Sequence, residues 1–330
     1  MANRKHITEL ALGFYSAGII LVHAKDIKKV GQQSPDEAEL AEDCHIYLIL
    51  TRPRLCYVPG SIVIGERETV GKMQYTSKGV PHQFEFRLNG KPNADEVKIS
   101  EYPHSDLLLI RDGEISLRAP AHLISMMCNY VEEPSVRDFE VQYVGMSYAD
   151  GKRSARDRLQ SHSTLQQVLA DLSHDSPESE VLLALVQYEA PQTIMTFDGR
   201  DKSLKLEDDR DVVSALRRQE EKITEDLQIS LIEAGLIKYF QPPYNDKYKN
   251  RFPHPTQKIL EEVYDIDFGA LTVEINTESI NARLRSGSRS VGAHHIASYD
   301  LHDVSTRRSF FNIMNVAFGS DASDHSGPIF

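Results

Sequence analysis

The chain has 330 residues, of which 40% are hydrophobic and 26% are charged, and its net charge is -12. This length is sufficient for two domains of ordinary size, each with a core of its own. The charge balance excludes a protein that is coated in nucleic acid over its whole surface, although an acidic body can still carry a local basic groove.

The cysteines and the N-terminal segment indicate the compartment. Cys44, Cys56 and Cys128 are scattered, and an odd count without C-x-x-C spacing excludes a disulfide framework and a cysteine-rich zinc site. We therefore expect a reducing, cytoplasmic setting and no membrane. The apolar run from Leu10 to Ala24 is short for a transmembrane helix, which needs ~20 residues. A buried helix followed by a strand is the preferred interpretation, and a signal peptide or anchor is the alternative.

Short runs with strand composition dominate the first part of the chain. The segment from Asp26 to Glu42 is polar and predicts a loop or an exposed helix. The strand-like runs that follow are separated by Gly, Pro and Asn, which is typical of a mostly β domain. We predict a β-rich N-terminal domain over residues 1–120, serving as scaffold, recognition or regulation. The runs are HIYLILT, LCYVPGSIVIG, KMQYTS, HQFEFRL, VKISEY and DLLLIRDGEISL.

Helical and strand patterns alternate in the second part of the chain. FEVQYVGMS predicts a strand, residues 153–172 predict one helix, EVLLALVQYE predicts a central strand, and residues 212–240 predict a helical region in two pieces. Asp198-Gly199 is a hairpin signal. Residues 120–134 fit a helix, or a helix that ends in a short strand. We predict a second domain over 121–255 and a C-terminal α/β module over 256–330 with a mobile tail.

Four short pieces in this second domain carry side chains suited to chemistry. Tyr143 and Gly145, in Tyr-Val-Gly, end a predicted strand. Arg158 and His162 are four residues apart, which would place both on one helix face. Glu233 lies beside the apolar face of a later helix, where an unpaired carboxylate is costly unless a positive group meets it. Asn245 follows Pro-Pro-Tyr, twelve residues beyond Glu233.

The ordered set resembles the GIY-YIG nuclease superfamily over roughly Cys128 to Asn250. Tyr143-Val144-Gly145 matches the second family motif, and Arg158 with His162 matches the helix that carries the essential Arg. EAGLIKYFQPPYN, from Glu233 to Asn245, is similar to the corresponding stretch of the bacterial excision-repair nuclease subunit. The resemblance implies a mixed α/β (α+β) fold, with a small core whose central, mainly antiparallel sheet is flanked by helices.

The first family motif, Gly-Ile-Tyr, has no full match. Its best candidate is Cys128-Asn129-Tyr130, because the gap to Tyr143 is compatible with a hairpin. The Gly and the Ile are both absent, however. If residues 120–134 form a helix throughout, Tyr130 is not the motif tyrosine, so its role stays open at this point.

These residue types suit the hydrolysis of a phosphodiester. Glu233 can hold one Mg²⁺ or Mn²⁺, which keeps several waters and stabilises the leaving oxygen. The planar fork of Arg158 can neutralise phosphate oxygens. The resemblance assigns the general base to a motif tyrosine, here Tyr143 or Tyr130, which needs positive charge or a metal nearby because of its high reference pKa. His162 would relay a proton or contact phosphate.

Other residues are expected to support this site. Asn245 would hold the loop after the Glu233 helix, and Gly145 would allow close backbone approach at a tight turn. The acidic stretch 207–211 could bind metal or, as we prefer, cap the helix that follows. Basic residues near these elements are expected to contact nucleic acid. They are Lys152, Arg153, Arg156, Lys238 and Lys247.

The sequence therefore predicts a metal-dependent endonuclease that cleaves DNA, with RNA left open as a substrate. A restriction- or phage-defence-type effector is the favoured role, by analogy with the family. One alternative is a nucleic-acid-binding or assembly protein in which the missing Gly-Ile reflects lost catalysis. Another is a complex subunit that cleaves only with a partner protein, which the N-terminal domain could bind. A homo-oligomer is also compatible with two-strand cleavage.

Overall fold

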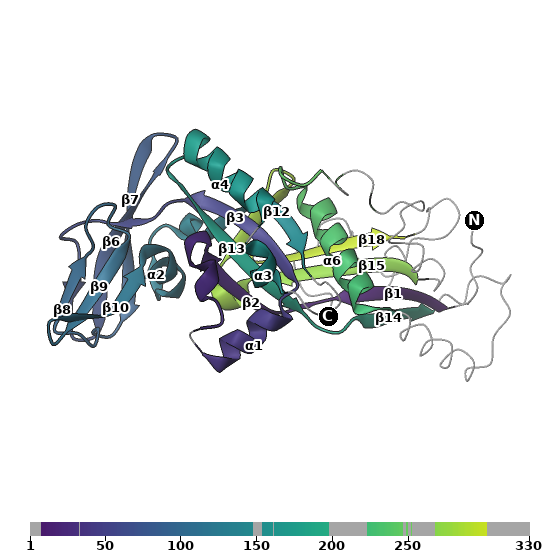
Figure 1. Ribbon diagram of the computed structural model, residues 1–330, viewed down its shortest axis with the longest axis horizontal. Coiled ribbons are helices and arrows are strands. Elements are labelled where there is room, and N and C mark those ends of the chain that lie inside the picture. Colours follow the sequence, from purple (N-terminus) through teal and green to yellow (C-terminus); the bar gives the residue numbers. More distant parts are fainter. Residues whose placement is uncertain are drawn as a thin grey trace.

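The computed structural model describes residues 8–32, 34–147, 154–160, 162–197, 223–246, 249, 252 and 268–301. It combines helices with several mostly antiparallel sheets, which confirms the predicted α+β class. Figure 1 shows an elongated molecule in which a β-rich part at one end adjoins a larger part that contains two sheets and a long helix. Within these described residues no helix is long and apolar enough to span a membrane.

A six-stranded sheet forms the centre, in the order β17-β16-β12-β3-β13-β2. Its described pairs are antiparallel apart from β12–β16. β3 and β13 are almost continuously buried because both faces of the sheet are covered, which explains why their sequences do not alternate. The strands are β2 (Ser16–His23), β3 (Ile46–Pro53), β12 (Asp138–Met146), β13 (Ser179–Tyr188), β16 (Arg283–Ser286) and β17 (Arg289–Gly292).

Short helices cover one face of this sheet and enclose a core that includes Tyr47, Ile49 and Leu183. Each α-helix begins at a side-chain cap: Ser34 accepts from Glu37 N–H, Ser154 forms a capping box with Asp157, and His162 accepts from Leu165 N–H. The helices are η1 (Ala24–Lys29), α1 (Pro35–Asp43), α3 (Ala155–Leu159) and α4 (Ser163–Asp175).

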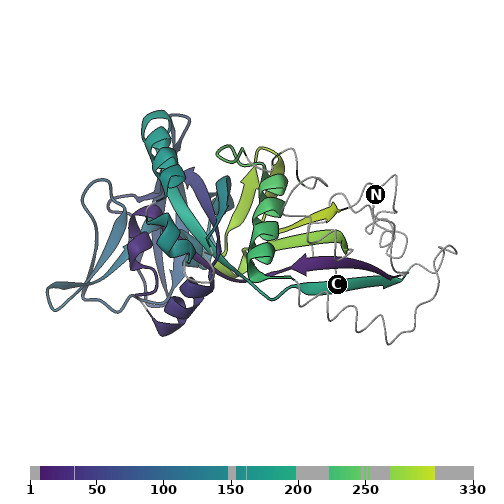
Figure 2. The ribbon, with the colours of Figure 1, turned by 45° about the vertical axis from the view of Figure 1, so that its right-hand side comes forward.

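Helix α6 (Glu225–Phe240) lies on the opposite face, between the central sheet and a second, four-stranded sheet (Figure 2). Apolar side chains surround α6 on nearly every side, which is expected for a helix packed between two layers. The second sheet has the order β14-β1-β15-β18. Its strands are β1 (Thr8–Phe14), β14 (Gln192–Phe197), β15 (Phe268–Asn276) and β18 (His294–Asp300), and η3 (Glu278–Ile280) follows β15.

A β-rich domain is inserted between β3 and β12. It contains a five-stranded sheet and a three-stranded sheet that share a core around Tyr57 and Phe86. The first has β4 (Cys56–Tyr57), β5 (Val63–Ile64), β6 (Glu68–Ser77), β7 (Val80–Asn89) and β11 (Tyr130–Val131). The second has β8 (Glu96–Ile99), β9 (Asp106–Arg111) and β10 (Glu114–Pro120), and α2 (Ala121–Met127) and η2 (Pro134–Arg137) complete the inserted domain.

The predicted domain boundaries do not follow these sheets. β1, β2 and β3 were assigned to a domain ending at residue 120, but they pair with β12, β13, β14 and β15 from the rest of the chain. The predicted C-terminal module is divided in the same way, because β15 joins one sheet and β16 the other. Pairing between strands that are distant in sequence leaves no local pattern in the residues. The predicted domain boundaries were therefore wrong, although most of the predicted strands are present.

Two local predictions are wrong, and one open alternative is decided. The helix predicted at the start of the N-terminal run is strand β1, because a strand buried on both faces has the same apolar composition as a buried helix. The strand predicted after it is present as β2. Residues 120–134 contain both predicted elements, helix α2 and then strand β11. The single helix predicted at 153–172 is two helices, α3 and α4. The hairpin signal at Asp198-Gly199, the first piece of the 212–240 helical region and the tail lie outside the described residues.

A buried arginine, Arg52, joins the central sheet to the inserted domain. Arg52 on β3 donates from Nε to Glu180 Oε1 on β13 over 2.8 Å, and neither side chain is more than 4% exposed. The same guanidinium donates to the carbonyl oxygens of Val136 and His122 in the inserted domain. It also lies over the Phe139 ring, 4.8 Å from the centroid. Arg52 therefore satisfies polar groups of both parts at once.

We expect Arg52→Met to lower the free energy of unfolding by about 3–5 kcal/mol, because the substitution leaves the Glu180 carboxylate buried without its partner. Equilibrium unfolding in urea measures the change. The control is Arg87→Met, which removes an exposed ion pair with Glu85 and should shift the midpoint little. Equal effects of the two substitutions would contradict the role given to Arg52.

Candidate active site

Tyr47 lies at the centre of a cluster of polar and aromatic side chains near the start of β3. Its ring is fully buried on the face of the central sheet that α3 and α4 cover. β3 pairs antiparallel with β12 in a register that places Tyr47 opposite Gly145. Backbone pairing thus brings together two residues that the whole inserted domain separates in sequence.

Gly145 provides the space for two aromatic rings. A Cβ atom at this position would lie 2.5 Å from Cζ and Oη of Tyr47 and 2.6 Å from Cε1 of Tyr143, which is closer than real contacts allow. The two rings stack with centroids 6.1 Å apart and an angle of 29° between their planes. The close approach expected at Gly145 is present, but side chains make it against a strand rather than backbone at a tight turn.

Two nitrogen donors point at the hydroxyl oxygen of Tyr47. Arg158 Nε donates to it over 3.0 Å, and His162 Nε2 lies 3.0 Å from it. His162 Nδ1 accepts from the Leu165 N–H, so a neutral imidazole carries its proton on Nε2 and donates that proton to Tyr47. The phenol oxygen therefore receives two hydrogen bonds, an arrangement that stabilises negative charge on it.

The chain positions Arg158 and His162 differently from the sequence prediction. α3 ends at Leu159 and α4 begins at Ser163, so the two residues do not share one helix face. Arg158 lies in the last turn of α3, whereas His162 is the N-cap of α4 and is 7% exposed. The break between the helices lets both side chains reach the same oxygen atom from different directions.

Tyr143 and Glu233 complete the cluster. The Tyr143 ring lies 5.4 Å from the His162 ring between centroids, and it is partly buried. Glu233 is a partly buried residue in the middle of α6, and its charge acts on both Tyr47 and Arg158. The structure thus brings Tyr143, Arg158 and His162 together around Tyr47, and it places Glu233 where its charge can act on Tyr47 and Arg158.

Burial and charge oppose each other at the Tyr47 hydroxyl. Burial raises its pKa most, and Tyr143 and Glu233 raise it further, while the hydrogen bond and charge of Arg158 lower it. The net result is a pKa well above the ordinary value. For Arg158, burial lowers the pKa, but the hydrogen bond to Tyr47 and the charges of Tyr47, Tyr143 and Glu233 together outweigh burial and raise it. Arg158 therefore remains a cation.

Asn245 fastens the end of α6 to β12. Its Oδ1 accepts from the Val144 N–H over 2.8 Å, and its Nδ2 donates to the Val144 carbonyl over 2.9 Å. The next residue back, Tyr244, donates its N–H to the Gln142 carbonyl and its hydroxyl to Asp171 on α4. These bonds hold the Glu233 helix against the strand that carries Tyr143 and Gly145.

Tyr130 does not belong to this cluster. It lies on β11 in the inserted domain, pairs with Arg87 on β7, and has the Arg87 guanidinium 5.3 Å from its ring centroid. Because β11 pairs with β7 and β12 pairs with β3, no hairpin joins Tyr130 to Tyr143, and the open question of Tyr130 is answered against it. The residue that the sequence analysis missed is Tyr47, although His45-Ile46-Tyr47 keeps the Ile-Tyr of the motif that was sought. In the family motif the two strands follow one another in the sequence, whereas in this chain the inserted domain separates the strand of Tyr47 from the strand of Tyr143.

The predicted basic residues have mixed positions. Arg156 is partly buried and donates from Nη1 to the Val30 carbonyl over 3.0 Å, so it ties α3 to the end of η1. Lys238 is partly buried in the last turn of α6. Lys152, Arg153, Lys247 and the acidic stretch 207–211 lie outside the described residues.

The donor set limits what metal the cluster can hold. In the part of the chain that the structure describes, no group of three or more His, Cys, Asp and Glu side chains is placed to bind one. A cation at this cluster would have Glu233 as its carboxylate ligand and water as most of the rest. That set fits Mg²⁺, which dehydrates reluctantly and is commonly held by one or two carboxylates.

We expect Asn245→Ala to destabilise the fold, because it leaves the buried N–H and C=O of Val144 without partners at about 1–3 kcal/mol for each group. Urea unfolding measures the loss. The matched control is Asn89→Ala at an exposed position, which should stay within about 0.5 kcal/mol of the parent. If Asn245→Ala behaves like the control, the side chain does not hold α6 against β12.

Comparison of the chain with family models, with curated proteins and with solved structures gives no significant match. The side chains around Tyr47 are therefore the basis on which a function is proposed.

Proposed function

We propose that this protein is a metal-dependent endonuclease that hydrolyses phosphodiester bonds of DNA. The observation that carries the proposal is the Tyr47 hydroxyl, which receives N–H donors from Arg158 and His162 within a cluster that also contains Tyr143 and Glu233. Two N–H donors stabilise the phenolate of Tyr47, and a phenolate suits proton abstraction from an attacking water.

The resemblance to the GIY-YIG nuclease superfamily supports this reading once Tyr47 replaces Tyr130. His45-Ile46-Tyr47 then takes the place of the first motif, and its strand lies beside the strand of Tyr143-Val144-Gly145. Arg158, Glu233 and Asn245 follow in the family order. We propose that the chain is a relative of this superfamily in which a β-rich domain separates the two motif strands.

Each side chain in the cluster has a chemical task in the proposed reaction. Tyr47 loses its own proton to solvent and, as the phenolate, accepts the proton of the attacking water, because its oxygen is the point on which both donors converge. Arg158 remains charged and can bind phosphate oxygens through its planar fork. His162, held by the Leu165 N–H, keeps its Nε2 proton directed at Tyr47 when the ring is neutral.

Glu233 is the residue that would hold Mg²⁺ or Mn²⁺. When bound, the ion supplies a Lewis acid for the leaving oxygen and for the developing charge on the phosphate. The Glu233 charge raises the pKa of Tyr47, so a cation that neutralised this carboxylate would also remove one obstacle to phenolate formation. A single partly buried carboxylate with water ligands fits this role.

The biological setting is proposed from family analogy: a cytoplasmic restriction- or phage-defence-type effector. Among the described residues, eleven large hydrophobic side chains are exposed, and nine of them belong to the inserted domain. This concentration makes the inserted domain the surface on which we propose that a partner protein binds. This observation supports the second candidate, a nuclease subunit that cleaves only within a complex. The nine are Val63, Ile64, Val80, Tyr102, Ile115, Leu117, Leu123, Met127 and Tyr130.

We expect the purified chain to nick or cut plasmid DNA with Mg²⁺ and to lose this activity in EDTA. Tyr47→Phe removes the group that takes up the proton and Glu233→Gln the metal ligand, so each should slow cleavage by about 10²–10⁴-fold. Gel assays with supercoiled DNA, single-stranded DNA and RNA measure the rates and the preference.

Tyr130→Phe is the matched control and should cleave at the parent rate, because Tyr130 lies in a different sheet. Retention of full activity by Glu233→Gln would sink the assignment. If the chain is inactive alone, the assay is repeated with the complex that co-purifies with an affinity-tagged form of the chain. Glu233-dependent cleavage there supports the subunit form of the proposal, and its absence contradicts both forms.

We expect the single-turnover cleavage rate to rise with pH through the neutral and alkaline range. The pKa of Tyr47 lies above its ordinary value, so the phenolate fraction increases about tenfold per pH unit below that pKa. Arg158 lowers this pKa, so Arg158→Gln should raise it further and reduce the rate at every pH below it. A rate that is independent of pH from 6 to 9 would exclude Tyr47 as the base.

A further inference from the structure

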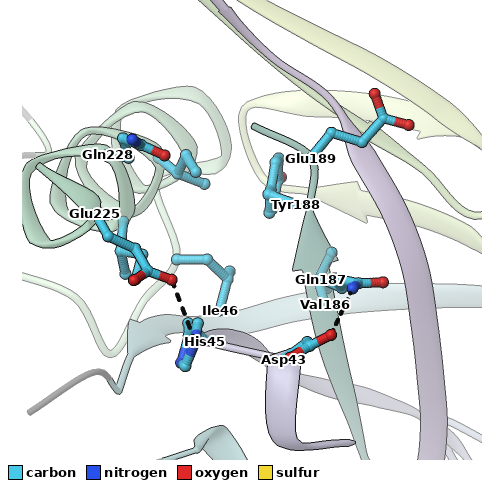
Figure 3. A pocket seen from close by; sticks show the side chains of 11 residues that line it. Asp43, His45, Ile46, Val186, Gln187, Tyr188, Glu189, Glu225 and Gln228 are labelled. Atoms are coloured by element: carbon cyan, nitrogen blue, oxygen red, sulfur yellow. Dashed lines mark hydrogen bonds and ion pairs between the residues drawn. The ribbon is translucent and has the colours of Figure 1, made fainter. Parts of the chain in front are cut away.

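A cavity of about 230 Å³ opens at the end of the central sheet, between β3, β13 and the first turns of α6. It is separate from the Tyr47 cluster, because alternate residues of a strand face opposite sides of the sheet. Ile46 lines the cavity, whereas Tyr47 faces α3 and α4. In Figure 3, Glu225 and Gln228 on α6 lie across the opening from Asp43 and Gln187.

The inner wall of the cavity is apolar. Ile46, Val186 and Ile232 line it and are each at most 2% exposed. Ile229 of α6 lines the same wall and is 5% exposed. A bound molecule could therefore bury methylene groups against this wall without displacing a polar side chain from it.

The rim is acidic. Three acidic residues line the cavity, Asp43, Glu189 and Glu225, and the lining residues include no Lys or Arg. In Figure 3 the Glu189 carboxylate is directed away from the side chains of α6. His45 Nε2 lies 3.9 Å from Glu225 Oε1, and Gln187 Nε2 donates to Asp43 Oδ2 over 3.0 Å. A carboxylate has about four acceptor positions, so one amide donor leaves Asp43 with capacity for a ligand.

Tyr188 also lines the cavity, but its hydroxyl oxygen is buried and does not face the open space. The charge that acts on this hydroxyl is that of Glu274, which does not line the cavity. The cavity therefore combines an apolar wall with an acidic rim.

We propose that this cavity binds a small aliphatic amine in its protonated form, with the ammonium group at the carboxylate rim and the methylene chain against the isoleucine wall. The rim repels anions, and an uncharged apolar molecule would gain nothing from the carboxylates. The volume equals that of about seven water molecules at ~30 Å³ each, which suits an amine of a few carbons. The side chain of a lysine has the same chemistry.

The inference is independent of the proposed nuclease activity, because it concerns binding at a different place. Isothermal titration calorimetry of the full chain with n-butylammonium chloride is the test. Sodium butyrate and 1-butanol are the anionic and neutral comparators, and N-acetyl-lysine amide represents a lysine side chain of a protein. The titration contains neither metal nor nucleic acid, so its result does not depend on whether the chain cleaves DNA.

Two variants report on the two parts of the cavity. The double substitution Glu189→Gln with Glu225→Gln removes rim charge, and Gln228→Phe fills the opening from α6. Each should weaken n-butylammonium binding by about tenfold or more. Glu114→Gln is the matched control, because Glu114 is an exposed acid on β10 in the inserted domain. Thermal unfolding checks that all variants remain folded.

Saturable binding of n-butylammonium, with weaker binding of both comparators and of the cavity variants, supports a small-amine site. Saturation by N-acetyl-lysine amide alone supports the same chemistry with a protein lysine as its source. The proposal is overturned if neither amine saturates in the millimolar range, if 1-butanol binds as well as the amine, or if Glu114→Gln weakens binding as much as the rim variant.

Discussion

The antiparallel pairing of β3 with β12 is the constraint on which the candidate site depends. The register places Tyr47 opposite Gly145, and the missing side chain at Gly145 leaves room for the rings of Tyr47 and Tyr143 to stack. Any shift of one residue would turn Tyr47 to the α6 face and dissolve the cluster. The inserted domain connects the two strands, and hydrogen bonds from Arg52 to the carbonyl oxygens of Val136 and His122 hold that domain on the sheet.

The position of Glu233 follows from the way α6 is enclosed. The helix packs between two sheets and is apolar on most sides, so a carboxylate in its middle needs a reason to be there. Glu233 is partly buried and acts on Tyr47 and Arg158, and the Asn245 bonds to Val144 hold the helix end on β12. The opposite side of α6 faces the second sheet, which supports the helix without contributing to the cluster.

Burial and charge set the chemistry of the Tyr47 oxygen. Burial keeps the phenol protonated, while the two N–H donors favour its anion. Burial outweighs the donors, so the pKa of Tyr47 lies well above its ordinary value, and its anion would form more readily if positive charge were added nearby. The same sheet end also carries the acidic cavity next to His45, so neighbouring residues of β3 serve two environments on opposite faces.

Local patterns in the sequence predicted most elements and much of the cluster. Alternating and continuous apolar runs indicated β3, β12 and β13, because these patterns depend on residues near one another in the chain. Short motifs that resemble those of the GIY-YIG nucleases, in the same order, singled out Tyr143, Arg158, Glu233 and Asn245. Tertiary structure alone decided that Tyr47 joins them, that Tyr130 does not, and that β1 and β15 share a sheet. The physical reason is that hydrogen bonds between strands can join backbone segments at any separation in the sequence. The local periodicity of a strand therefore does not indicate which other strand it will pair with.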